Sequence, residues 1–260
     1  MDDFIKIMGT AGARFVVKQQ LRSSAGTWCR FGGTNFLIDP GPGTLVNCFA
    51  STPKLDPDLL DGILLSHRHL DHSTDLNIMV EAMTNGTYNR RGAVFLPASA
   101  VDFEPVLFSY LQAAVERMVI LEEGGRYEFC NIKFSTPVTH LHPVENYGFK
   151  FELPYGKISF ITDTAYFPEL IDHYRADMLI INVVLYEPVQ ARHIQHLDLV
   201  RVRELIRNIR PAVAVLTHFG TTMLANNPDR LAENLTEEIG VKVIAASDGI
   251  CINPRHYLQS

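Results

Sequence analysis

The sequence predicts an α/β (α+β) fold, with sheets covered by helices in a single domain spanning residues 1–260. In the middle of the chain, neighbouring apolar segments are separated by short glycine turns, which is typical of antiparallel hairpins. In the C-terminal third, strand-like segments alternate with helix-like segments, as in α/β crossovers. The 260 residues are 47% apolar, and no linker, repeat or low-complexity block divides them.

The N-terminal half is predicted to contain short strands followed by the first helices. The segments expected to form strands are FIKIMG (4–9), TWCRF (27–31), TNFLID (34–39), GILLS (62–66) and AVFLP (93–97). Gly32-Gly33 is expected to join the second and third of them, and a Pro/Gly turn to follow Asp39. Leu76, Met79, Val80 and Met83 have helical spacing, with Ser73 as the expected cap. Leu107, Tyr110, Leu111 and Ala114 repeat that spacing, with Pro105 near the first turn.

The C-terminal half is predicted to change from hairpins to alternating strands and helices. The strand-rich segments are 118–129, 131–140 and 147–163, and the last should form a hairpin that turns at Pro154-Tyr155-Gly156. Further strands are expected at 177–183, 212–218 and 241–249. Helices should lie between them, one marked by Val202, Leu205, Ile206 and Ile209 and one between Asn227-Pro228 and Gly240.

Composition narrows the classes of function. The net charge is −6 and the basic residues form no stripe, which argues against a nucleic-acid partner. No apolar run approaches the ~18 residues of a membrane span, and the start of the chain does not resemble a signal peptide. The four cysteines are far apart, which fits reduced thiols packed as small apolar groups. We therefore expect a cytoplasmic protein without a membrane partner.

The segment SHRHLDH, residues 66–72, is the strongest chemical signal in the chain. It follows an apolar strand and places His67, His69, Asp71 and His72 within six residues. Side chains alternate along an extended segment, so His67 and His69 point the same way and could bind one ion. Asp71 and His72 lie where the chain turns into a helix and could face a second ion. Imidazole and carboxylate groups together suit zinc, iron or manganese.

Two ions need further ligands, and other predicted strand ends supply them. The strand ISFIT leads to Asp163, and the strand AVAVLT leads to His218. The segment PVTHLHP offers His140 and His142. In each case apolar residues run directly into a ligand-type side chain, as when a strand delivers a group to one edge of a sheet.

These motifs, in this order, resemble those of the metallo-β-lactamase superfamily of metal-dependent hydrolases. The pattern is most similar to the ribonuclease Z-like and cyclic phosphate phosphodiesterase-like branch, over nearly the whole chain. The motifs are IMGTAGAR (7–14), NFLIDPGPGT (35–44), SHRHLDH (66–72), Thr162-Asp163 and Thr217-His218. The resemblance implies a four-layer αββα sandwich.

The resemblance also implies a ligand set. His67, His69 and His142 would hold one divalent ion; Asp71, His72 and His218 would hold another, and Asp163 would bridge them. His142 is preferred to His140 because the family's histidine precedes an aromatic-Gly-aromatic strand start, which Tyr147-Gly148-Phe149 matches. His140 remains a rival. Zinc is the favoured metal, and manganese or iron would also fit.

Several residues outside this set are weaker candidates. His196 matches a family position that assists proton transfer or phosphate contact, although a lone histidine before a helix also serves as a cap. His193 is a weaker alternative. Asp39 and Asp248 either accept a bond from a ligating histidine or close a turn. The remaining residues of interest are Arg14 and Arg22, which could meet an anionic substrate or be structural, and His173 and His256, expected to be surface histidines.

The resemblance implies a dinuclear phosphodiesterase that acts on a small anionic substrate through a bridging hydroxide. Asp71 and Asp163 would orient the water, and His196 would assist the leaving group. The interval from His142 to Asp163 is short and lacks the tRNA-gripping arm of some ribonuclease Z enzymes, which favours a small phosphodiester or cyclic phosphate. The alternatives are a glyoxalase II-like thioesterase, a mononuclear-iron persulfide dioxygenase-like enzyme and a non-catalytic binding module. A homodimer is compatible with the sequence.

Overall fold

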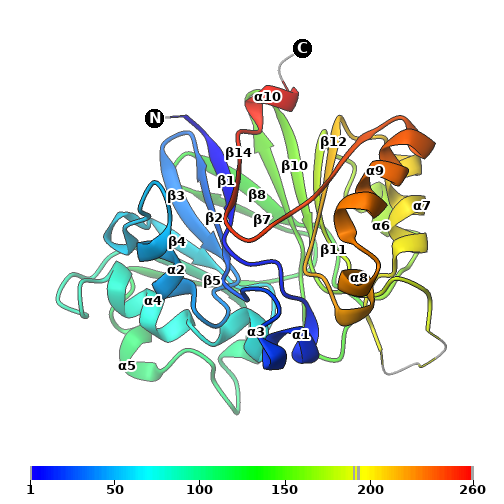
Figure 1. The fold of residues 1–260 in the computed structure, drawn as a ribbon. Coiled ribbons are helices and arrows are strands. Elements are labelled where there is room, and N and C mark those ends of the chain that lie inside the picture. The colour runs from blue at the N-terminus through cyan, green and yellow to red at the C-terminus, as the bar shows by residue number, and fades with distance from the viewer. Residues whose placement is uncertain (1, 190, 192–193, 259–260) are drawn as a thin grey trace.

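The computed structural model describes residues 2–189, 191 and 194–258. In this part of the chain the strands form two seven-stranded sheets that pack face to face (Figure 1). Their arrangement with flanking helices is the four-layer αββα sandwich that the sequence predicts. The first sheet has, in spatial order, the strands β14 (Ile250–Ile252), β1 (Phe4–Ile7), β2 (Thr27–Phe31), β3 (Thr34–Ile38), β4 (Gly62–Leu64), β5 (Ala93–Pro97) and β6 (Arg117–Leu121).

The second sheet repeats this plan with later parts of the chain. Its strands, in spatial order, are β13 (Lys242–Ala245), β12 (Val213–Thr217), β11 (Met178–Asn182), β10 (Gly156–Ile161), β9 (Phe149–Leu153), β8 (Ile132–Thr136) and β7 (Gly125–Phe129). The chain passes from the first sheet to the second between β6 and β7, and it returns to the first sheet with β14 after β13. In each sheet four neighbouring strands are parallel, β3 to β6 in the first and β10 to β13 in the second. Parallel strands end at the same edge, so the residues that follow them are brought together there.

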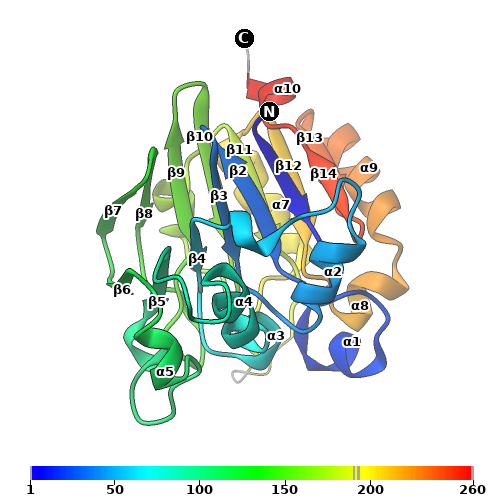
Figure 2. The same ribbon diagram turned by 90° about the vertical axis from the view of Figure 1, so that its left-hand side faces the viewer.

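Helices cover the outer face of each sheet. On the first sheet lie the helices α2 (Thr44–Ala50), α4 (Leu76–Met83) and α5 (Ser109–Gln112), seen in front of the strands in Figure 2. On the second sheet lie α6 (Leu170–His173), α7 (Leu199–Ile209) and α9 (Pro228–Ile239). The remaining short elements are α1 (Ala13–Gln19), α3 (Leu70–Ser73), α8 (Thr221–Ala225), α10 (Arg255–Leu258) and the 3-10 turns at Pro57–Leu59 and Ala98–Ala100. No helix of the described ranges is both long and apolar enough to cross a bilayer.

Aromatic rings form the centre of the core between the sheets. Phe151 of β9 stacks on Phe36 of β3 with ring centroids 5.1 Å apart, and it meets Phe31 edge-on at 5.6 Å. Phe134 and Phe160 complete the cluster from the second sheet. Because these rings come from both sheets, their packing sets the spacing between the strand ends that border the functional site.

Two local predictions about helix starts are wrong. Ser73 does not cap the following helix, because it lies inside α3 and its hydroxyl donates to the Arg68 and His69 carbonyls, both at 3.0 Å. The turn that carries Asp71 and His72 thus forms a short helix of its own, and α4 begins after Asp75.

Pro105 lies outside the next helix, which is a single turn. The Asn77 side chain donates to the Val106 carbonyl at 2.7 Å and accepts from the Phe108 amide at 2.8 Å. These bonds tie the residues after the proline to α4, and Phe108 has an extended backbone, so α5 begins only at Ser109. By contrast, the hairpin at 154–156 and the helix from Asn227-Pro228 to Gly240 form as predicted.

The thiols fit their predicted role only in part. The structure describes all four cysteines as free. Cys29 and Cys48 are buried and pack as small apolar groups, whereas Cys130 and Cys251 are exposed.

We predict that Phe151→Ala lowers the free energy of unfolding by about 3–5 kcal/mol, because it removes the ring shared by both sheets. Phe103→Ala is the matched control, since the Phe103 side chain is 97% exposed. It should change stability by no more than about 0.5 kcal/mol. Denaturant unfolding of both variants measures the difference, and equal effects would contradict this account of the core.

Candidate metal centre

The ligand-type residues meet at one edge of the sandwich. His67 follows β4, Asp163 follows β10 and His218 follows β12, each within three residues of the strand's end. The strands run in directions that bring these ends to the same edge, between the two sheets and close to α1 and α3 (Figure 1). Rigid, buried strands thus hold side chains from distant parts of the sequence in one place.

Two groups of potential ligands result. One consists of His67, His69 and His142, and the other of Asp71, His72, Asp163 and His218. Within each group the potential donor atoms lie within 4.8 Å of one another. The groups adjoin, because the rings of His67 and His72 are 4.1 Å apart.

In the first group the imidazole nitrogens face inward. His69 Nδ1 lies 3.1 Å from His67 Nε2 and 3.0 Å from His142 Nε2. Two nitrogens that each bind zinc at about 2.0–2.1 Å in a tetrahedron would be about 3.3 Å apart. The spacing therefore suits a single ion of this kind.

The opposite nitrogens of the rings are held by the protein. His67 Nδ1 donates to Ser66 Oγ at 2.9 Å, and His142 Nδ1 donates to the Gln195 carbonyl at 3.1 Å. His72 Nδ1 donates to Asp39 Oδ2 at 2.9 Å, and Ser66 Oγ donates to that same oxygen at 2.7 Å. Each outer bond fixes the tautomer of its ring and leaves the inner nitrogen with a lone pair to offer a metal.

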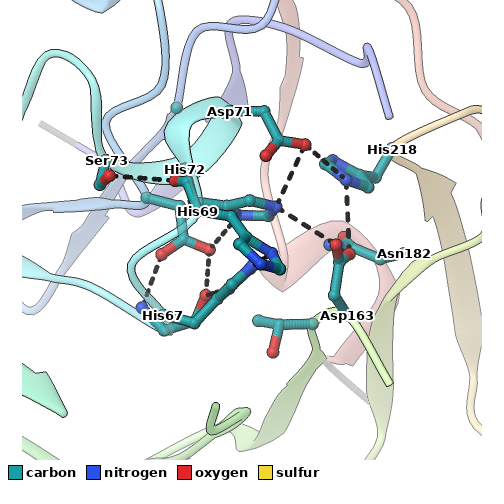
Figure 3. Close-up of polar contacts among 12 residues, drawn as sticks. His67, His69, Asp71, His72, Ser73, Asp163, Asn182 and His218 are labelled. Atoms are coloured by element: carbon teal, nitrogen blue, oxygen red, sulfur yellow. Dashed lines mark hydrogen bonds and ion pairs between the residues drawn. The ribbon is translucent and has the colours of Figure 1, made fainter. Parts of the chain in front are cut away.

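The second group contains nitrogens that have no hydrogen-bond partner among the described residues. His72 Nε2 and His218 Nε2 are buried in this state. His72 Nε2 is 3.4 Å from Asp163 Oδ2, and His218 Nε2 is 3.3 Å from Asp163 Oδ1. Figure 3 shows these side chains and Asp71 pointing toward one another. A buried polar atom without a partner is costly, so the arrangement fits a bound cation.

The pKa shifts of the ligand-type residues also fit a bound cation. Burial, with His72 adding to it, holds the pKa of His67 well below its usual value, and burial lowers that of His142 to about 4. Burial also opposes protonation of His72, but Asp71 and Asp163 outweigh it and hold the pKa well above the usual value. For Asp163, burial favours the neutral acid, yet His218 and His196 outweigh it and the pKa falls well below normal. The second group therefore attracts positive charge at the position that a metal would take.

His218 occupies a constrained backbone conformation. Its φ is +58°, in the left-handed region that non-glycine residues rarely adopt. The next residue, Phe219, is held by the glycine loop after β1, because its amide donates to the Thr10 carbonyl at 2.7 Å and its carbonyl accepts from the Gly12 amide at 2.9 Å. A Cβ at Gly12 would lie 2.0 Å from the His218 carbonyl oxygen, so only glycine fits there.

The structure separates the two rival histidines. His142 joins His67 and His69, whereas His140 points elsewhere and bonds Tyr174 and the Asp163 backbone. His196 lies beside the site, with Nδ1 buried, unpartnered among the described residues and 3.5 Å from Asp163 Oδ2.

The remaining candidates fall into two classes. Asp39 bonds a histidine of the site, whereas Asp248 does not; it accepts from Thr10 and the Ser23 amide and so orders the glycine loop. The others lie as follows: Arg14 is exposed on α1, Arg22 is half-buried in the next loop, His173 is half-buried and His256 is exposed, while His193 lies outside the described residues.

Sequence reasoning missed several residues that support the site. Asn182 ends β11 and donates to Asp163 Oδ1 at 2.8 Å, and Ser66 joins His67 to Asp39. Asn182 carries a detectable signal, because it ends a buried strand in the same way as Asp163. Ser66 and Tyr174 carry none, since their partners are distant in sequence.

Substituting Gly12 tests the contact that holds His218. We predict that Gly12→Ala lowers stability by about 1–3 kcal/mol and reduces bound metal, because the new methyl group must displace the His218 backbone. Lys18→Ala, at an exposed position of the same helix region, is the control. Denaturant unfolding and elemental analysis are the measurements, and wild-type values for both in Gly12→Ala would refute the steric argument.

Comparison with known proteins agrees with the fold and the motifs. The family described as "Beta-lactamase superfamily domain" matches residues 34–219. An uncharacterized protein of Methanocaldococcus jannaschii is 28% identical over 95% of this chain and 93% of its own length. A ribonuclease Z of Methanopyrus kandleri is 24% identical over 96% of this chain and 98% of its own.

A solved structure shows the same architecture. The metallo-β-lactamase fold protein YhfI from Bacillus subtilis superposes with a TM-score of 0.78 at 17% identity, covering 97% of this chain and 99% of that one. The family match spans the segments that carry the two ligand groups, from β3 to just beyond β12. On the strength of that match, the chain belongs to the metallo-β-lactamase superfamily of metal-dependent hydrolases.

Proposed function

We propose that the protein is a dinuclear phosphodiesterase that hydrolyses a small phosphodiester or cyclic phosphate. The observation that carries the proposal is the pair of adjoining ligand groups, in which the protein holds the outer nitrogens of His67, His72 and His142 so that their inner nitrogens face the site. The likeness to a protein named ribonuclease Z supports a phosphodiester as the bond that is cleaved.

In this proposal each ligand group would hold one divalent ion. His67, His69 and His142 would hold the first, and Asp71, His72 and His218 the second. Asp163 would serve both, since its two carboxylate oxygens face different partners: Oδ1 lies near His218, and Oδ2 near His72 and His196. The bound ions, with zinc favoured, would supply a hydroxide near neutral pH and stabilise the charge that develops on phosphate.

The protein residues orient the reacting groups. The Asn182 amide holds Asp163 Oδ1 from one side, which limits rotation of the carboxylate. Asp71 Oδ2 lies 3.6 Å from His218 Nε2 and 3.8 Å from His72 Nε2, where it can align a water molecule. His196 stands at the edge of the site, where burial lowers its pKa and the Asp163 carboxylate, 3.5 Å from Nδ1, only partly opposes that shift. We assign it the transfer of a proton to the leaving oxygen.

The net charge of the protein and the length of one interval in its sequence bear on the size of the substrate. The net charge of −6 disfavours a long polyanion. Only 20 residues separate His142 from Asp163 in the sequence, and β9 and β10 occupy 11 of them, so no long arm is inserted there. These features support a small substrate over a large RNA.

Metal removal tests the proposed chemistry directly. We expect chelator-treated protein to lose hydrolysis of bis-(p-nitrophenyl) phosphate and to recover it when zinc or manganese is added. Magnesium and calcium serve as controls, because hard ions prefer oxygen ligands and should restore little activity. Activity that survives complete stripping would end the proposal, and faster cleavage of a thioester such as S-lactoylglutathione would favour the thioesterase alternative.

Replacing His196 separates proton transfer from metal binding. His196→Ala should lower kcat by about 10²–10⁴-fold, the usual contribution of a general acid or base, while bound metal stays the same. His256→Ala is the matched control because His256 is exposed on α10, at the opposite end of the molecule from the site (Figure 1). Steady-state kinetics and elemental analysis decide the point. Loss of metal in His196→Ala would make His196 a ligand instead.

A further inference from the structure

His140 is buried beside the metal centre but belongs to neither ligand group. The side chains of His140 and His142 point in different directions, although only one residue separates them. His140 Nε2 meets the Tyr174 hydroxyl at 2.7 Å, and Nδ1 lies 3.2 Å from the backbone carbonyl of Asp163. Both rings are enclosed, since His140 is 3% exposed and Tyr174 is fully buried.

The partners of His140 determine where its proton lies. The Asp163 carbonyl can only accept. The Thr162 hydroxyl, also 3.2 Å from Nδ1, donates to the Tyr147 carbonyl at the shorter distance of 2.9 Å, so we place the hydrogen on Nδ1. A ring that carries its hydrogen on Nδ1 has a lone pair on Nε2, and this nitrogen accepts from the Tyr174 hydroxyl at 2.7 Å. Tyr174 therefore selects the tautomer of His140 that donates to Asp163.

The Asp163 carbonyl is held from a second direction as well. The Asn146 side-chain amide also donates to it. Asn146 and His140 lie at the two ends of one tight loop, because the His140 amide donates to the Asn146 carbonyl at 2.9 Å and Thr139 bridges Tyr147. Through Tyr147, whose amide donates to the Ser66 carbonyl at 3.2 Å, the loop also reaches the segment that begins the histidine motif.

The space for this contact comes from Gly148. A Cβ there would lie 2.5 Å from the Tyr174 hydroxyl and 2.5 Å from the Phe160 carbonyl. The glycine of Tyr147-Gly148-Phe149 thus lets Tyr174 approach His140. It provides a physical reason for a small residue at the start of β9.

We propose that His140 is a positioning residue which, oriented by Tyr174, fixes the backbone of Asp163 and thereby the carboxylate that both ions share. The inference rests on the proposed dinuclear site, but it concerns metal affinity and not the substrate. A donor bond to the backbone two residues beyond β10 limits how far the Asp163 side chain can move between the two ligand groups.

Three substitutions isolate the hydrogen bond. His140→Asn places an amide near the position of Nδ1 and keeps a donor for Asp163, whereas His140→Leu fills a similar space without one. Tyr174→Phe removes only the hydroxyl that orients the ring. His256→Ala controls for the loss of an exposed histidine. The measurements are the zinc dissociation constant by chelator competition, without substrate, and the Tm of the metal-free proteins.

We expect His140→Leu and Tyr174→Phe to weaken zinc binding by about 10–100-fold, as loss of bonds that orient metal ligands usually does. His140→Asn should stay close to wild type in zinc affinity even if its Tm falls. This rescue is the feature that a packing role alone would not produce.

Two results would overturn the inference. One is wild-type zinc affinity in His140→Leu; the other is equal loss of affinity in His140→Asn and His140→Leu. If the leucine variant does not fold, Tyr174→Phe decides, and unchanged zinc affinity there rejects the orienting role of the hydroxyl. Wild-type protein that binds zinc yet cleaves no phosphodiester would overturn the proposed function alone, because zinc binding is measured separately.

Discussion

The buried carboxylate of Asp163 is the interaction on which the rest of the site depends. An ionised carboxylate removed from water is stable only when positive charge and hydrogen-bond donors surround it. Here histidines from α3, the segment before α7 and the end of β12 all face it. The Asn182 amide adds a donor from β11. One buried acid therefore requires four separate segments to be in place at the same time.

The sandwich architecture makes this convergence possible. The parallel strands of both sheets end at one edge, and the aromatic core holds the sheets at a fixed separation. One strained backbone position lies at the site itself. His218 has a left-handed backbone conformation, which persists because the glycine loop binds Phe219 and presses against His218 itself.

Supporting bonds distinguish this site from a histidine-rich turn at the surface. Asp39 binds both His72 and Ser66, and Ser66 binds His67, so one carboxylate orients a histidine of each ligand group. Asp248 plays a different part, holding the glycine loop that positions His218. Both aspartates follow strand-like segments in sequence. Their roles differ because Asp39 faces the gap between the sheets, while Asp248 lies over the loop after β1.

The sequence by itself determined the family, most of the strands, the longest helices and the ligand-type residues, because strand periodicity and the spacing of His67, His69, Asp71 and His72 are local properties. It failed at Ser73, whose hydroxyl bonds back to carbonyls of its own short helical turn, and at Pro105, where bonds from Asn77 hold the residues that follow. Only the tertiary structure decided between His140 and His142. On an extended strand both side chains would point to the same side, so the sequence could not separate them. The choice depended on which ring Tyr174 could reach, and that contact spans 34 residues. The structure likewise showed that Ser66 and Asn182 support the site, because the residues to which they hydrogen-bond come near them only when the chain folds.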